Sequence, residues 1–198
     1  TGLFSGNYTV TVTDAMGCMA TQMVSVLATS TILQSTFAAG NNHRGNMFDI
    51  TSINTVMITS FDGHPMANTD YAIYYKTGTY VGSETNAGAW TLIGTAAGVV
   101  AQPTGSPTPL LIPVNITIPS GQTYAFYISS TVLTVSQNYT NGTLAGNIFS
   151  QDANIQFKEG CGLEYPFATA VPFTPRVWNG QIHYCTGPVG VENVLSSE

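Results

Sequence analysis

The stretch Thr123-Tyr124-Ala125-Phe126-Tyr127-Ile128-Ser129 decides the fold class of this chain. Tyr124, Phe126 and Ile128 occupy alternate positions, so an extended backbone places their side chains on one face. Aromatic and β-branched residues at this spacing are typical of a strand. The segment therefore predicts a β-strand with one face in a core.

The same alternation recurs on both sides of this stretch. Tyr71, Ile73 and Tyr75 also share a face, and Asp62-Gly63 and Asn141-Gly142 are turn signals between such runs. Many short strands at this spacing predict an all-β fold, a two-sheet β-sandwich of jelly-roll-like type over residues 32–185. The expected strands are Met47–Ile50, Thr55–Phe61, Tyr71–Lys76, Ala89–Thr95, Leu110–Ile118, Thr123–Ser129, Val132–Val135, Ile155–Lys158 and Arg176–Tyr184.

The N-terminal region, residues 1–28, predicts two further strands. Gly6–Asp14 alternates strictly, and Cys18–Val26 follows after a turn. Two strands cannot bury a face by themselves. We therefore expect residues 1–28 to be the terminal strands of another repeat whose earlier strands precede Thr1; the alternative is that they join the following domain.

Composition excludes several classes of function. Charged residues make up only 7% of the chain, against about a quarter in an average domain. The net charge is −6, and the four cations are Arg44, Lys76, Lys158 and Arg176. Nucleic-acid binding requires several cationic contacts with phosphates, so no nucleic-acid partner is expected. No apolar run approaches the roughly 20 residues that span a bilayer, so membrane insertion is not expected either.

The three cysteines, Cys18, Cys161 and Cys185, cannot all pair within the chain. The pairing that the sequence favours is a disulfide between Cys161 and Cys185, with Cys18 paired outside this chain. Spacing alone does not fix connectivity, so three buried free thiols remain the alternative.

The N-terminal strands carry a specific resemblance. The segment GNYTVTVTDAMGCMATQMVSV (residues 6–26) resembles the last two strands of the immunoglobulin-like repeats in SprB-type gliding-motility adhesins. The resemblance implies an Ig-like repeat remnant in front of the sandwich. It also implies that Cys18 has its mate near the start of the repeat.

A second resemblance covers most of Phe37–Tyr184. It rests on the segments IYYKTGTYVGSETNAGAWTLIGTA, IPSGQTYAFYI, YTNGT and PRVWNGQIHY. These segments are similar to a module that recurs in large secreted proteins of gliding and related bacteria. The module has no assigned activity in that family, so the resemblance implies a secreted, cell-surface location more than a chemistry.

The C-terminal segment, residues 186–198, resembles the linker before the C-terminal sorting domain of type IX secretion substrates. The resemblance implies that the type IX secretion machinery is a partner during export and that the sorting domain was removed or left out. A frayed terminus is the alternative.

Catalytic and metal chemistry find little support in the sequence. His43, His64 and His183 show no ligand spacing, and no G-x-S-x-G elbow is present. We therefore expect that the chain is not an enzyme and that it has no catalytic residue, no metal site and no cofactor. A structural calcium ion held by loop carbonyls and one acid stays open; the isolated acids considered for it are Asp49, Asp62, Asp70 and Asp152.

Carbohydrate binding is the most specific idea about function, because exposed aromatic rings beside amides suit sugar rings. The candidate ligand-binding residues are Tyr80, Trp90, Tyr165, Trp178 and Asn179. Tyr80 and Tyr165 are expected to be exposed, whereas Trp90 and Trp178, both on alternating strands, are better explained as core residues. Sites are expected in loops 38–46, 77–88 and 159–175.

The sequence thus predicts a non-catalytic module of an exported cell-surface protein that acts in adhesion or gliding and meets a surface glycan or another surface ligand. One alternative is a carbohydrate-binding module of a secreted polysaccharide-degrading enzyme. A second alternative is a structural subunit of a surface filament.

Overall fold

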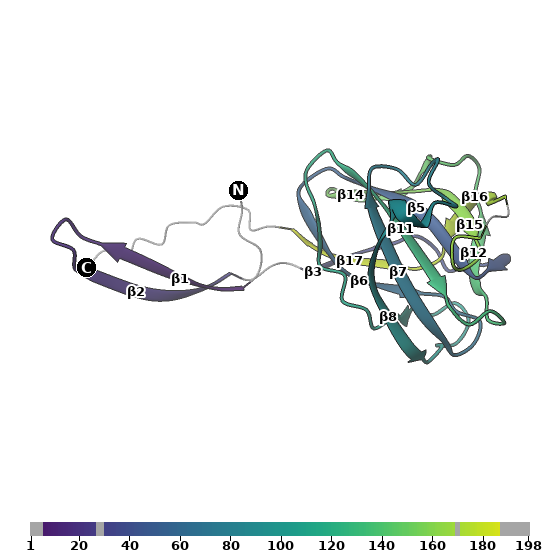
Figure 1. Ribbon diagram of the computed structural model, residues 1–198, viewed down its shortest axis with the longest axis horizontal. Helices are drawn as coiled ribbons and strands as arrows, with labels where there is room; N and C mark the ends of the chain where they lie inside the picture. Colours follow the sequence, from purple (N-terminus) through teal and green to yellow (C-terminus); the bar gives the residue numbers. More distant parts are fainter. Residues whose placement is uncertain (1–5, 27–29, 169–170, 187–198) are drawn as a thin grey trace.

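The computed structural model of the chain describes residues 6–26, 30–168 and 171–186, and these ranges are all-β (Figure 1). Their one helical segment is the 3-10 turn η1 (Ala87–Ala89). Accordingly, the described part of the chain has no helix of the length and hydropathy that a membrane crossing requires. The predicted all-β class is confirmed.

Two sheets form the sandwich. The smaller one contains β3 (Ser30–Gln34), β6 (Val56–Gly63), β9 (Thr108–Pro109), β10 (Ile116–Ile118) and β17 (Gln181–Thr186). The larger one contains β4 (Asn41–His43), β5 (Gly45–Ser52), β7 (Thr69–Thr77), β8 (Thr91–Val99), β11 (Thr123–Ser130), β12 (Gln137–Asn141), β13 (Ile148–Gln151), β14 (Ile155–Lys158), β15 (Gly160–Leu163) and β16 (Phe173–Trp178). The pairings between these strands are antiparallel.

The main core lies between the two sheets and is rich in aromatic rings. Phe48 on β5 stacks on Trp178 with ring centroids 5.0 Å apart. The Phe157 ring contacts the Phe48 ring edge-on, also at 5.0 Å between centroids. The faces predicted from alternation are confirmed, because Tyr71 and Ile73 of β7 and Phe126 of β11 all point into this core.

A second core covers the outer face of the larger sheet. Met47 and Tyr127 alternate with the main-core residues of β5 and β11, so they point away from the smaller sheet. Phe167 lies over them, with its ring 4.9 Å from that of Tyr127. The second core consists of Met47, Tyr80, Trp90, Ala125, Tyr127, Cys161, Leu163 and Phe167. The larger sheet is therefore buried on both faces around β5 and β11.

One edge of the smaller sheet is interrupted. The segment between β9 and β10 touches β6 only at intervals, through backbone N–H donors of Leu110 and Val114. Leu111 and Asn115 lie between or beside these contacts with φ values of 59° and 52°, which a strand does not contain. The predicted strand Leu110–Ile118 is therefore wrong except over Ile116–Ile118.

Two other predicted strands are also wrong. Val132–Val135 is a turn, closed by a hydrogen bond from the Val135 N–H to the Val132 carbonyl, and Leu133 is exposed. Arg176–Tyr184 is two strands, β16 and β17, which belong to different sheets. Gly180 separates them, and a Cβ there would lie 2.3 Å from the backbone carbonyl oxygen of Asp62, so only glycine fits.

The predicted disulfide between Cys161 and Cys185 is wrong, because both thiols are free and buried. Cys161 lies on β15, with its side chain in the second core on the outer face of the larger sheet, while Cys185 lies on β17 of the smaller sheet. The larger sheet and the main core separate the two side chains. Cys18, also free, is exposed.

The N-terminal region forms a hairpin of β1 (Gly6–Thr13) and β2 (Met19–Val26), as predicted. Figure 1 shows it standing apart from the sandwich. Val10, Val12 and Val24 on the hairpin are exposed. That a missing part of an Ig-like repeat covers this hairpin stays a prediction. The linker predicted over 186–198 lies, from residue 187 on, outside the described residues.

Candidate functional site

A polar pocket of about 360 Å³ opens where loop 131–136 meets the turn between β4 and β5. We call it the Arg44 pocket. Its lining residues are Asn42, His43, Arg44, Leu133, Thr134, Ser136, Glu164 and Phe173. The pocket therefore joins loops 38–46 and 159–175, two of the three segments in which the sequence predicted sites.

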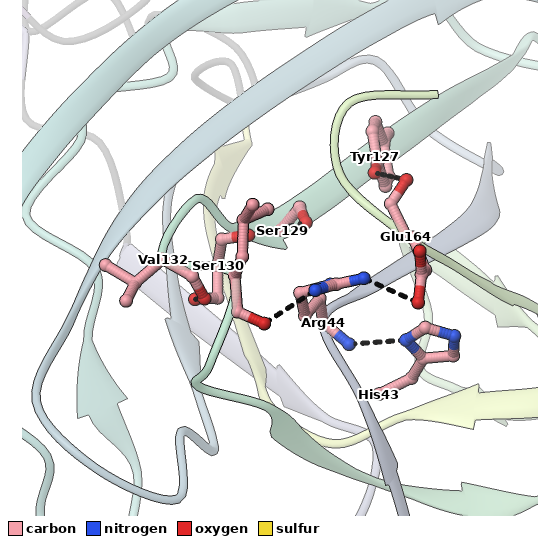
Figure 2. Close-up of polar contacts among 8 residues, drawn as sticks. His43, Arg44, Tyr127, Ser129, Ser130, Val132 and Glu164 are labelled. Atoms are coloured by element: carbon pink, nitrogen blue, oxygen red, sulfur yellow. Dashed lines mark hydrogen bonds and ion pairs between the residues drawn. The ribbon is translucent and has the colours of Figure 1, made fainter. Parts of the chain in front are cut away.

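Arg44 is the anchor of this pocket (Figure 2). It occupies the bend between β4 and β5, and its carbonyl accepts a hydrogen bond of 2.9 Å from the Ser130 N–H. Its Nη1 donates to the Leu133 carbonyl at 2.6 Å, and its Nη2 pairs with Glu164 Oε1 at 2.5 Å. Because the Arg44 side chain is only 18% exposed while that of Glu164 is 43% exposed, the carboxylate forms the open rim of the ion pair.

His43 presents a donor to the pocket. Its Nδ1 accepts a 2.8 Å hydrogen bond from the Arg44 N–H, so the neutral ring carries its proton on Nε2. Burial lowers the pKa of His43; the Glu164 carboxylate opposes this effect, and the charges of Arg44 and Arg176 add to it. The ring is therefore neutral at pH 7, with an Nε2–H donor.

Phe173 supplies an apolar surface. Its side chain is 52% exposed at the start of β16, and its ring centroid lies 5.2 Å from that of His43. The guanidinium carbon of Arg176 lies 5.8 Å from the Phe173 ring centroid and 5.4 Å from that of Tyr139. An exposed ring flanked by donors and acceptors is the kind of surface that ring-shaped polar ligands use.

The aromatic residues predicted to bind sugar lie elsewhere. Tyr80 and Trp90 are 3% and 8% exposed in the second core, and Trp178 is fully buried in the main core. The expected exposure of Tyr80 is wrong, because its side chain packs in the second core. The core alternative for Trp90 and Trp178 is confirmed. Tyr165 is half-buried, less open than expected. Burial, together with a hydrogen bond to Tyr165, raises the pKa of Tyr74 to about 12.

Asn179 is also buried, so it positions a loop and does not face a ligand. Its Oδ1 accepts from the Ala39 N–H at 2.9 Å, and its Nδ2 donates to Thr140 Oγ1 at 3.0 Å. These bonds tie Ala39, just before β4, to β12 and to the end of β16.

A smaller pocket of about 240 Å³ brings loops 77–88 and 159–175 together, with Tyr80, Glu84 and Cys161 among its lining residues. Burial raises the pKa of the Cys161 thiol to about 12, and the negative charges of Glu84 and Asp49 contribute. The thiol is thus protonated at neutral pH, which removes the nucleophilic form.

The pair of His183 and Asp62 is the nearest approach to an acid–base arrangement. His183 Nε2 lies 2.9 Å from Asp62 Oδ2 on the outer face of the smaller sheet. Ser60 faces His183 in the strand register. A serine nucleophile and its base would be joined by a hydrogen bond. In the described ranges no such bond joins the Ser60 hydroxyl to His183.

The acids considered for calcium are each engaged by protein groups. Asp152 accepts from the Asn154 and Ile155 N–H groups and from the Tyr184 hydroxyl, and Asp70 accepts from the Gly98 N–H. Within residues 6–26, 30–168 and 171–186, no group of three or more His, Cys, Asp or Glu residues is arranged to hold a metal ion.

The comparisons with known proteins add no functional name. No protein-family model matches the chain, and no curated protein matches it. Among solved structures, the chain is similar to the VP2 subviral particle of infectious bursal disease virus, at 13% identity and a TM-score of 0.21. The match covers 95% of this chain and 43% of the viral chain, so this chain spans less than half of that protein's length. Values this low carry no argument about function.

Sequence reasoning missed Arg44, Glu164 and Phe173 as site residues, although it placed all three in candidate loops. One signal was available. The chain has only four cations, and two of them, Arg44 and Arg176, act on His43. Rare charges that gather at one place mark a site better than frequent aromatic residues do.

Proposed function

We propose that this chain is a non-catalytic recognition module of an exported cell-surface protein, and that it acts in adhesion by binding a glycan in the Arg44 pocket. The observation that carries the proposal is the composition of the pocket. An exposed aromatic ring, a neutral imidazole donor and an ion pair surround one concave surface. Hydroxyl-rich rings need both an apolar face and such fixed polar groups.

The position of the pocket in the sandwich supports a role in presentation. The chain enters the sandwich at Ser30 on β3, and Figure 1 draws β3 near one end and β12, β15 and β16 near the other. Residues of the pocket come from the turn beside β4, the partner of β12, and from the ends of β15 and β16. A ligand bound there lies away from the point of attachment.

Glycan binding is tested on a glycan array with the labelled 198-residue chain. Binding to a restricted set of glycans is expected, and Arg44→Gln should reduce it at least about tenfold, as the loss of one charge-assisted contact does. Lys76→Gln is the matched control, since it removes a cation of β7 that the pocket does not include. Uniform absence of binding, or equal loss in the two variants, would contradict the proposal.

A second candidate, a structural subunit of a surface filament, is favoured by one observation. The strands β2 and β3 contain no Lys, Arg or Pro, the residues that protect sheet edges from pairing with another chain. Light scattering at rising protein concentration tests it. Self-assembly predicts growing particles, whereas monomers throughout the range favour the recognition module.

A further inference from the structure

We infer that the ligand of the Arg44 pocket is an acidic sugar residue, a pyranose with one anionic group such as the carboxylate of a uronic acid. This inference rests on the proposed glycan-binding function and names the class of glycan. It starts from charge, because the cation Arg176 lies beside this pocket, whose own Arg44 and Glu164 pair with each other, on a chain that is otherwise acidic.

The local charge follows from three side chains. Arg44 and Glu164 line the pocket, and Arg176 lies just outside this lining, with its guanidinium carbon 5.8 Å from the ring centroid of the lining residue Phe173. Glu164 pairs with Arg44 at 2.5 Å, whereas Arg176 forms no ion pair within the described ranges. The charges of Arg44 and Glu164 balance within the pocket, so Arg176 supplies one positive charge beside it, on a chain whose net charge is −6. A charge of this sign attracts an anionic ligand and its approach is faster at low salt.

Arg176 is held in place before any ligand binds. Its Nη1 donates to the Pro175 carbonyl at 2.7 Å, and its guanidinium lies over the rings of Tyr139 and Phe173. A guanidinium fixed in this way loses little side-chain entropy on binding and still has N–H donors for an anion. Carboxylate and sulfate oxygens match those donors in pairs.

The remaining lining suits the sugar ring itself. The exposed Phe173 ring offers an apolar face for C–H groups, and His43 Nε2–H offers a donor. Thr134 and Ser136 line the same pocket with hydroxyl groups. Glu164 is the exception, because its exposed carboxylate repels an anion. Removing the Glu164 charge should therefore strengthen the binding of an acidic ligand, and this direction can be tested.

The test compares three oligosaccharides of equal length by calorimetry on the full chain: an oligogalacturonate, a sulfated galactan fragment and a neutral galactan fragment. We expect at least one acidic ligand to bind at least about tenfold more tightly than the neutral one, with the preference weakening as salt is added. The two acidic ligands identify which anionic group is preferred. Equal or tighter binding of the neutral ligand overturns the inference.

Two variants separate this inference from the general proposal. Arg176→Gln should weaken the acidic ligand about tenfold or more and leave the neutral one unchanged. Glu164→Gln keeps an oxygen that accepts from Arg44 but removes the repulsion, so the acidic ligand should bind more tightly.

If Glu164→Gln weakens binding instead, Glu164 is a hydroxyl acceptor for a neutral sugar and the inference fails, while glycan binding stands. If no glycan binds the wild-type chain, both fail. Circular dichroism melting curves check that each variant is folded, and Lys76→Gln again serves as the control.

Discussion

At the scale of single residues, the buried carboxylates of Glu159 and Asp49 differ in how well the fold satisfies them with hydrogen bonds. Glu159 is buried but fully engaged, because the Thr143 hydroxyl and the Leu144 N–H both donate to it at 2.9 Å. Asp49, on the outer face of β5, accepts a single backbone N–H bond, from Tyr80 at 3.1 Å. Burial raises the pKa of Asp49 above its ordinary value of 3.8, and hydrogen bonds from Thr79 and Tyr80 only partly oppose this effect.

The sign of the Asp49 effect leads to a prediction. A raised folded-state pKa means that the protonated carboxyl stabilises the fold below pH 3.8, and that this contribution is lost as the pH rises through the folded-state value. At pH 7 the ionised carboxylate therefore lowers stability. Asp49→Asn should raise the melting midpoint at pH 7 by about 2 °C or more and change it little near pH 3. Scanning calorimetry at both pH values measures this; a lower midpoint at pH 7 would contradict it.

At the scale of elements, the sequence predicted best the strands that lie between two apolar environments. β7 and β11 were found because their main-core residues alternate with polar or second-core residues. β12 and β15 were missed. The β12 segment Gln137-Asn138-Tyr139 has a polar sequence, yet Gln137 is buried and donates hydrogen bonds to Asn46 and the Ile128 carbonyl. The β15 segment Gly160-Cys161-Gly162 has no alternation of large apolar and polar side chains. Tertiary contacts, not local period, make these segments strands.

The candidate site shows the same limit. The loops were predictable because turn residues and a lack of alternation mark them. The pocket itself could not be predicted. It depends on the turn at 131–136, whose apolar residues led to the wrong prediction of a strand, and on the pairing of β4 with β12, which are far apart in sequence. Which aromatic rings are exposed also depends on the second core, which no single segment encodes.

The second core leads to a prediction at the element scale. Phe167 packs on Tyr74, Trp90 and Tyr127, so Phe167→Ala should lower the free energy of unfolding by about 3 kcal/mol or more. Phe173→Ala is the matched control; its exposed ring belongs to neither core, and its loss should cost less than about 1 kcal/mol. Urea denaturation of both variants measures the difference. Equal losses would mean that the second core adds little stability.

At the scale of the whole molecule, the sandwich contains both cores, whereas the hairpin has an exposed apolar face. Two-stranded sheets are marginal in water, while a sandwich with a closed core is not. The boundary between residues 28 and 32 stays a prediction; β3 begins at Ser30.

A deletion tests that boundary. A chain of residues 30–186 should fold cooperatively with a melting midpoint within about 2 °C of that of the full chain. The isolated hairpin peptide, residues 6–26, should show no strand signal in circular dichroism. A midpoint lower by about 10 °C in the shorter chain would mean that the hairpin is part of the sandwich.

The separation of Phe173 from both cores has a consequence for how this protein can diverge. Phe173, Thr134 and Asn42 line the pocket but belong to neither core, so substitutions there should alter the proposed ligand specificity without endangering the fold. Phe167, only a few positions earlier in the chain, has no such freedom. Related chains under selection for different ligands are thus expected to vary at the first set and to keep an aromatic ring at the second, so that new specificities arise on an unchanged scaffold.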